Sequence, residues 1–144
     1  YNLNILPFGV RLQRAHDYKD DRLTDFVAQV GPGPQRHRDG PFDVLLLQEV
    51  FSSPFVPRVM RSKLCRQQRL VAALQEAGYA HHAVPKQPSV AGMISRLKAT
   101  DTGLVIASRH PISERASHVL RSATSGSPRG VLFAKVDPPT GGAL

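Results

Sequence analysis

The chain has 144 residues, which is enough for one domain with a hydrophobic core and too few for two comfortable ones. A hydrophobic content of 41% predicts a folded chain rather than a disordered one, and the single cysteine excludes an internal disulfide. The 19 basic and 11 acidic residues give a formal charge of +8, which favours anionic partners such as phosphodiesters, nucleic acid or acidic lipid surfaces. We slightly favour a different explanation of this charge, in which the arginines are spread over solvent-exposed helix faces and bind no particular partner. Basic residues are locally dense only at 36–38 and 58–69.

Apolar periodicity and helix-breaking residues predict alternating strands and helices. The clearest helix carries acidic residues in its first turn and an apolar stripe, and it ends at a Gly-Pro-Gly-Pro run. In chain order we expect a strand at 2–6, a helix at 17–30, a loop up to 41, a strand at 43–50, a helix at 58–77, a short strand at 80–84, a loop at 86–100, and strands at 103–108, 118–122 and 130–136.

The strand at 43–50 carries the main candidate for a functional residue. Four aliphatic residues run directly into Gln48 and Glu49, and a run this apolar predicts a strand buried on both faces. A buried carboxylate is costly unless it is paired, hydrogen-bonded or bound to a metal, and core strands of α/β proteins end where ligand sites open. Glu49 is therefore either a ligand for Mg²⁺ or the partner of an arginine from the following helix, and the residues alone favour neither.

Three further residues are weaker candidates. Asn2 would converge with Glu49 on one cation if their strands are neighbours, although a polar residue at a strand end is ordinary. Asp101 precedes a buried strand and is either a metal ligand or, as the residues favour, part of a plain turn. Arg129 lies in a glycine- and serine-rich turn, which either holds a phosphate or is an ordinary hairpin turn. His81 and His82 are adjacent in a predicted strand and point to opposite faces, so we do not expect them to bind one metal. The sequence has no zinc spacing, P-loop, dinucleotide fingerprint or nucleophile elbow.

Taken in order, five motifs resemble the N-terminal half of the endonuclease/exonuclease/phosphatase superfamily and, within it, the neutral, Mg²⁺-dependent sphingomyelinases. The motifs are Tyr1-Asn2-Leu3, Leu47-Gln48-Glu49-Val50-Phe51, Gly78-Tyr79, the run from Asp101 to Ile112, and the run from Arg129 to Val136. The resemblance implies a four-layer, deoxyribonuclease-like α/β sandwich, present here in part. It also implies that Glu49 and Asn2 help to hold the catalytic Mg²⁺ and that Asp101 matches a region that holds an additional cation in some bacterial relatives.

The activity implied is metal-assisted attack of water on a phosphodiester, which would convert sphingomyelin to ceramide and phosphocholine. Family members place a catalytic His, a Gly-Asp-x-Asn motif and an Asp-His pair after the Lys-Val strand, and this chain ends before them. We therefore expect residues 1–144 to be one partial domain, cut at both ends. The resemblance also places Asn2 at the end of its strand, and this expectation replaces the strand at 2–6.

Alone, such a chain should be inactive and should form no stable oligomer, and a sphingomyelinase-like parent protein would be membrane-associated or secreted. The alternatives are a nuclease or inositol-phosphate phosphatase of the same superfamily, or a non-catalytic relative that acts as a binding or scaffold protein.

Overall fold

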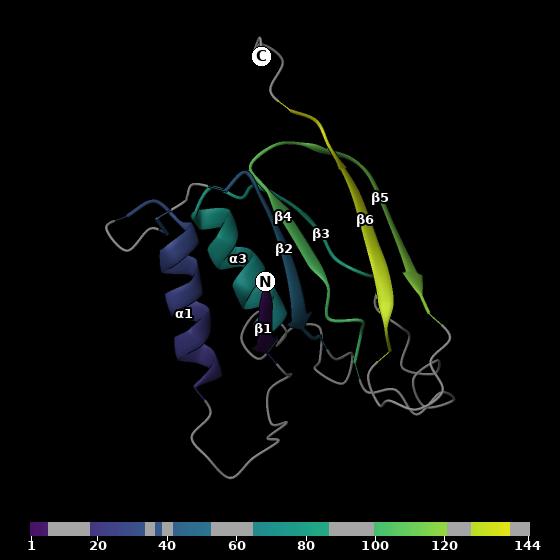
Figure 1. Cartoon of the computed structure of the whole chain (residues 1–144), viewed down its shortest axis with the longest axis horizontal. Coiled ribbons are helices and arrows are strands. Elements are labelled where there is room, and N and C mark those ends of the chain that lie inside the picture. Colours follow the sequence, from purple (N-terminus) through teal and green to yellow (C-terminus); the bar gives the residue numbers. More distant parts are fainter. Residues whose placement is uncertain are drawn as a thin grey trace.

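The structure is a computed structural model, and it describes residues 1–5, 18–33, 37–38, 42–52, 65–86, 100–120 and 128–138. Two helices and six strands lie in these ranges (Figure 1). They are β1 (Asn2–Ile5), α1 (Lys19–Val30), β2 (Val44–Val50), α3 (Arg66–Glu76), β3 (His81–Ala83), β4 (Val105–Ser108), β5 (Ile112–Val119) and β6 (Gly130–Val136).

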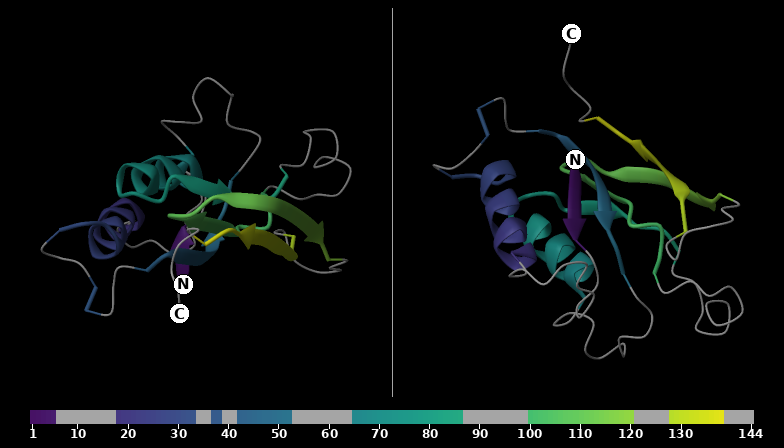
Figure 2. Two further views of the ribbon diagram at one scale, coloured as in Figure 1. Left: turned by 90° about the horizontal axis from the view of Figure 1, so that it is seen from above. Right: turned by 60° about the horizontal axis from the view of Figure 1, so that its bottom comes forward.

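The strands form two sheets. The larger sheet has the order β1-β2-β4-β3, in which β1 and β2 are parallel and the other neighbours are antiparallel. Strands β5 and β6 form a separate antiparallel pair that contacts β3 and β4. Helices α1 and α3 lie together on one side of the larger sheet (Figure 2). The described part of the chain is thus layered as helices, sheet and second sheet.

The hydrophobic core lies between the two helices and the larger sheet. Helix α1 buries Leu23, Phe26 and Val30, and α3 buries Leu70 and Leu74. These side chains pack on the inward-facing residues of β1, β2 and β4, which are Leu3, Ile5, Leu45, Leu47, Val50, Val105 and Ala107. Among the described residues, no helix is both long and apolar enough to cross a membrane.

Strand β2 is buried on one face only, so the prediction of burial on both faces is wrong. Leu45 and Leu47 face the helices and are buried, whereas Leu46, on the opposite face, is 62% exposed. The second sheet contacts β3 and β4, and Leu46 stays mostly exposed in the described part of the chain. The run of aliphatic residues correctly predicted a strand here, but it did not indicate which face of the strand is covered.

Strand β4 is the strand that is buried on both faces. Val105 and Ala107 belong to the core beneath the helices. Ile106 and Ser108 point to the other side and are also buried, at the place where β6 contacts β4. The predicted second core strand is therefore confirmed, and it begins at Val105 rather than at residue 103.

Other predicted elements differ mainly in their ends. Strand β6 has the predicted bounds, and β1 runs on from Asn2 to Ile5, so the expectation that Asn2 ends its strand is wrong. The helix predicted at 58–77 is described only from Arg66, because residues 53–64 lie outside the described part of the chain, as do residues 87–99 of the predicted loop. The strand predicted at 118–122 is wrong in extent, since β5 spans Ile112–Val119. Most residues of β5 are polar and exposed, so they show no alternation of apolar and polar residues that would predict a strand.

An ion pair joins the two helices and should make stability depend on pH. Asp20 accepts hydrogen bonds from the buried Arg66 (3.1 Å from Nε) and from Arg69 (2.9 Å from Nη1). The Arg66 hydrogen bond holds the pKa of the Asp20 carboxyl below its ordinary value, and the charges of Arg66 and Arg69 add to this. Ionised Asp20 therefore stabilises the folded state above about pH 4, and this contribution is lost as the pH falls through the lowered pKa.

Replacement of Asp20 by asparagine should lower the free energy of unfolding at pH 7 by about 1 kcal/mol, a modest loss because the Asp20 side chain is 44% exposed and water screens the pair. The difference from the unaltered chain should shrink towards zero below the lowered pKa. Urea unfolding measured from pH 2 to 7 tests this, with Asp21→Asn as the control in the same helical turn. Equal effects of the two substitutions would contradict the prediction.

Candidate metal site

Strand β2 ends in an uncommon backbone conformation at Glu49. The φ angle of Glu49 is 59°, and Asn4 on the neighbouring strand has a φ of 49°, so both residues are left-handed. The register shifts between the pairs Asn2–Gln48 and Ile5–Val50, which marks a bulge at this point. Asparagine adopts this conformation readily, but for other residues with a Cβ it costs roughly 1–2 kcal/mol. A strained residue at the end of a core strand suggests a functional role.

The bulge determines which side chain enters the core. In a regular strand, residue 49 would share the helix-facing side with Leu45 and Leu47, because side chains alternate. Here Val50 is completely buried, and Glu49 is only half-buried. The left-handed backbone at Glu49 therefore keeps its carboxylate out of the apolar core.

The carboxylate of Glu49 has no hydrogen-bond or ion-pair partner among the described residues. The arginines that the structure describes on α3, Arg66 and Arg69, bind Asp20 instead. The arginines of residues 53–64 lie outside the described ranges. A half-buried carboxylate in this position is suited to bind a cation through its hard oxygen atoms.

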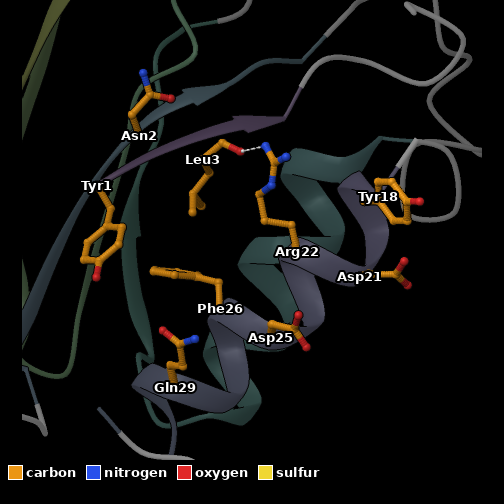
Figure 3. Close-up of a pocket in the computed structure, with 9 residues that line it drawn as sticks. All are labelled: Tyr1, Asn2, Leu3, Tyr18, Asp21, Arg22, Asp25, Phe26 and Gln29. Carbon is orange, nitrogen blue, oxygen red and sulfur yellow. Dashed lines mark hydrogen bonds between the residues drawn. The ribbon is translucent and has the colours of Figure 1, made fainter. Parts of the chain in front are cut away.

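Asn2 lies beside the end of β2, as the sequence predicted for a shared site. It pairs in register with Gln48, one residue before Glu49. Its side chain points away from α1, whereas that of Leu3 points towards the helix (Figure 3). The Asn2 Oδ1 atom accepts a hydrogen bond from the Asn4 backbone N–H (3.0 Å), and a second lone pair on this oxygen is left for a ligand.

Asp101 is buried beside the site, with an exposed fraction of 2%. Its Oδ1 atom accepts hydrogen bonds from the backbone N–H groups of Ser52 (2.9 Å) and Gly103 (3.0 Å), and its Oδ2 atom accepts one from Gln67 Nε2 (2.9 Å). Burial raises the pKa of the Asp101 carboxyl, and these hydrogen bonds partly offset the rise. The metal role suggested for Asp101 stays a prediction, but these contacts favour a structural role.

Arg129 lies immediately before β6 and is exposed. Its carbonyl oxygen accepts a hydrogen bond from the Leu120 N–H (2.8 Å). The next residue, Gly130, packs so closely on the turn after Asp101 that an added Cβ would lie 2.6 Å from Thr102 Cγ2. Arg129 is therefore tied to the same turn that borders the end of β2, and its phosphate-binding role stays a prediction.

A groove of about 470 Å³ lies between β1 and α1 (Figure 3). It is lined by Tyr1, Asn2, Leu3, Tyr18, Asp21, Arg22, Asp25, Phe26 and Gln29. Arg22 Nη1 donates a hydrogen bond to the Leu3 carbonyl oxygen across it (3.1 Å). Asn2 belongs to this lining and Glu49 does not, so the groove adjoins the candidate metal site without containing its principal ligand.

Within the described ranges, no group of three or more histidine, cysteine, aspartate or glutamate side chains is placed to hold a metal. His81 and His82 pair with the successive residues Ser108 and Ala107, so they lie on opposite faces of β3, as predicted. The site as far as it is described consists of one carboxylate and one amide. This set fits Mg²⁺, which is typically bound by one or two protein carboxylates and keeps several waters.

Several solved structures are similar to this chain, whereas no protein-family model and no curated protein sequence matches it. A β-hairpin deletion mutant of beta toxin from Staphylococcus aureus superposes with a TM-score of 0.66 and 18% identity over 96% of the chain. The chain shares the fold of the part of this toxin that it matches. SmcL follows with a TM-score of 0.56 and 20% identity over 83% of the chain, and a second S. aureus beta toxin structure with 0.53 and 19% over 81%.

The chain spans 45%, 36% and 39% of these three proteins, respectively. The likeness confirms the α/β, deoxyribonuclease-like fold that the motifs implied, of which this chain covers less than half. At identities of 18–20% it shows the fold and leaves the roles of individual residues as predictions.

Two features of this site have no signal in the sequence. Gln67 carried no motif and read as an ordinary helix residue, yet it is buried and contacts both Asp101 and the Val50 carbonyl oxygen. The left-handed backbone at Glu49 has no sequence signal either, because glutamate is not a residue that favours it. Only the pairing of β1 with β2 reveals the bulge that requires it.

Proposed function

We propose that this chain carries part of the site of an Mg²⁺-dependent, sphingomyelinase-like phosphodiesterase, with Glu49 as the principal metal ligand and Asn2 assisting. The observation that carries the proposal is the carboxylate of Glu49, which is half-buried, has no partner among the described residues, and is kept out of the core by a strained backbone. The fold shared with beta toxin and SmcL supports it. The chain spans less than half of those proteins, so the whole activity is proposed for a protein that contains this chain.

The residues of the site divide the chemistry among them. Mg²⁺, when bound, would neutralise the phosphate oxygens of a phosphodiester and stabilise the leaving alkoxide. Glu49 supplies the negative charge that such a cation needs, and Asn2 supplies a neutral carbonyl oxygen. Arg129 offers a guanidinium group to the phosphate from the start of β6.

We propose a phospholipid at a membrane surface as the substrate, with sphingomyelin giving ceramide and phosphocholine. The formal charge of +8 would draw the protein to anionic surfaces, and it would equally draw it to nucleic acid. Parallel assays on sphingomyelin vesicles, DNA and an inositol phosphate, with a catalytically active protein that contains this chain, decide between these classes. Cleavage of DNA alone would overturn the lipid assignment.

The metal site can be tested on the 144-residue chain itself. Mn²⁺, which takes the same oxygen ligands as Mg²⁺, broadens the NMR signals of nearby amides. We expect titration with Mn²⁺ to broaden the amide signals of Asn2 and of residues 48–51 first, and excess Mg²⁺ to restore them. In the Glu49→Gln variant this local broadening should be lost.

The control for this titration is Glu76→Gln, which removes an exposed carboxylate from the last residue of α3. This variant should bind Mn²⁺ at the β2 end like the unaltered chain. Broadening that is spread over all acidic residues, or that persists at residues 48–51 in Glu49→Gln, would overturn the assignment of Glu49 as the metal ligand.

A further inference from the structure

The backbone that follows Glu49 is held by a buried network of side chains and turn residues, here called the strand-end network. It consists of Ser52, Gln67, Asp101 and Gly103, arranged around Val50. Asp101 is its centre, since its carboxylate accepts hydrogen bonds from Ser52, Gly103 and Gln67. The Asp101 N–H also donates back to the Ser52 carbonyl oxygen (3.0 Å), which closes a ring between the two segments.

Both backbone groups of Val50 belong to this network. The Val50 N–H donates to the Gly103 carbonyl oxygen (2.9 Å), and its carbonyl oxygen accepts a hydrogen bond from Gln67 Nε2 (2.7 Å). The same Gln67 nitrogen donates to Asp101, so one buried amide joins helix α3 to both segments. One residue further on, the Phe51 N–H donates to the Ile5 carbonyl oxygen (3.1 Å).

These contacts have a direct consequence for the residue that precedes them. Hydrogen bonds hold both the N–H and the carbonyl oxygen of Val50. The Val50 side chain can therefore reach its buried position only if the backbone of Glu49 leaves the extended conformation. A regular strand would instead turn the Glu49 side chain to the helix-facing side, where Leu45 and Leu47 lie. The strained φ of Glu49 therefore persists because the surrounding hydrogen bonds over-determine it.

We propose that Asp101 and Gln67 are positioning residues, which hold Glu49 in its left-handed conformation and so aim its carboxylate at the cation. This inference rests on the proposed function of Glu49 as a metal ligand. Asp101 acts through three hydrogen bonds to protein donors, and its contribution is to set the direction of the Glu49 side chain.

Two variants of the 144-residue chain test the proposal. Asp101→Asn keeps the size of the side chain and the oxygen that accepts from Ser52 and Gly103, but it turns an NH₂ group towards Gln67 Nε2, so that two donors face each other. Gln67→Met keeps the volume and removes the donor to both Asp101 and Val50. Gln68→Met, one residue along the same helix, is the matched control, because Gln68 is only half-buried.

Two readouts are needed, and only one depends on the metal. The intraresidue NOE between the Glu49 amide proton and its Hα is strong when φ is positive, and we expect it to weaken in Asp101→Asn and Gln67→Met but not in Gln68→Met. The Mn²⁺ concentration that half-broadens the signals of residues 48–51 should rise about 10- to 100-fold in the first two variants, as is typical when a partner that orients a metal ligand is removed.

The outcomes separate this inference from the proposed function. An unchanged Glu49 NOE and unchanged Mn²⁺ affinity in folded Asp101→Asn would overturn the positioning role, whatever Glu49→Gln does. Loss of the entire folded spectrum in Asp101→Asn would also overturn it, because the network would then support the whole domain rather than Glu49. If Glu49→Gln keeps its local Mn²⁺ binding, the metal proposal fails, and the NOE alone still decides whether Asp101 and Gln67 set the backbone of residue 49.

Discussion

Replacement of Glu49 by alanine should abolish Mg²⁺-dependent phosphodiesterase activity in a catalytically active protein that contains this chain. A metal ion that acts as a Lewis acid contributes several kcal/mol to transition-state stabilisation, so loss of its principal ligand should lower kcat/KM by at least about a thousandfold. Hydrolysis of sphingomyelin in mixed micelles, measured across a range of Mg²⁺ concentrations, provides the test. Glu76→Ala, which changes an exposed residue at the end of α3, should retain full activity. Full turnover by Glu49→Ala would contradict the metal-ligand assignment.

A second substitution at the same position separates function from stability. Glycine adopts the left-handed conformation without the cost that alanine shares with glutamate. Glu49→Gly should therefore be as inactive as Glu49→Ala, yet more stable than it by about 1 kcal/mol. Urea unfolding of the two variants measures this difference. A gain in stability over Glu49→Ala without any recovery of activity is expected where a strained residue is kept for its chemistry rather than for the fold.

Local patterns in the sequence predicted the elements whose exposed and buried faces differ. The helix of α1 followed from its acidic first turn and apolar stripe, and β6 followed from a short apolar run between turn residues. Strand β5 was largely missed, because nearly all its residues are exposed in the described structure and so follow no alternation. Burial of β2 on both faces was also expected and is wrong, since Leu46 is exposed on the face away from the helices.

The sequence predicted which residues form the candidate site, but it did not predict the backbone geometry and hydrogen bonds that hold them. The position of Glu49 after an aliphatic run marked it as a candidate, and the parallel pairing of β1 with β2 brings Asn2 beside it. The hydrogen bonds that fix Glu49 join segments that are far apart in the sequence, since Asp101 is 34 residues from Gln67 and 49 from Ser52. Such pairings depend on how strands and helices pack, and no local pattern of residue types encodes them.

Substitution of Gly103 by alanine should destabilise the chain by about 2–4 kcal/mol, the sum of a conformational cost and a steric one. The φ angle of Gly103 is 67°, in the left-handed region that glycine adopts freely. An added Cβ would lie 2.6 Å from the Cδ1 and Cε1 atoms of the Phe51 ring, which is too close for both to keep their places. Urea unfolding of the 144-residue chain measures the loss. A cost near zero would contradict this account of the turn.

Gly78→Ala is the matched control, because Gly78 also has a positive φ, of 96°. Its added Cβ would approach only the guanidinium end of Arg109, which donates a hydrogen bond to the Phe42 carbonyl oxygen and lies over the Tyr79 ring. The end of a long side chain can shift more easily than a ring, so we expect a cost of about 1–2 kcal/mol. The two variants should differ in a second respect. The Gly103 carbonyl oxygen holds the Val50 N–H directly after Glu49, so displacement of this turn should also weaken Mn²⁺ binding at residues 48–51. Gly78→Ala should leave that binding unchanged, since Gly78 lies at the end of α3 and has no contact with the end of β2 among the described hydrogen bonds. A loss of metal affinity in Gly103→Ala alone would show that the turn supports Glu49 in particular, beyond its contribution to the stability of the fold.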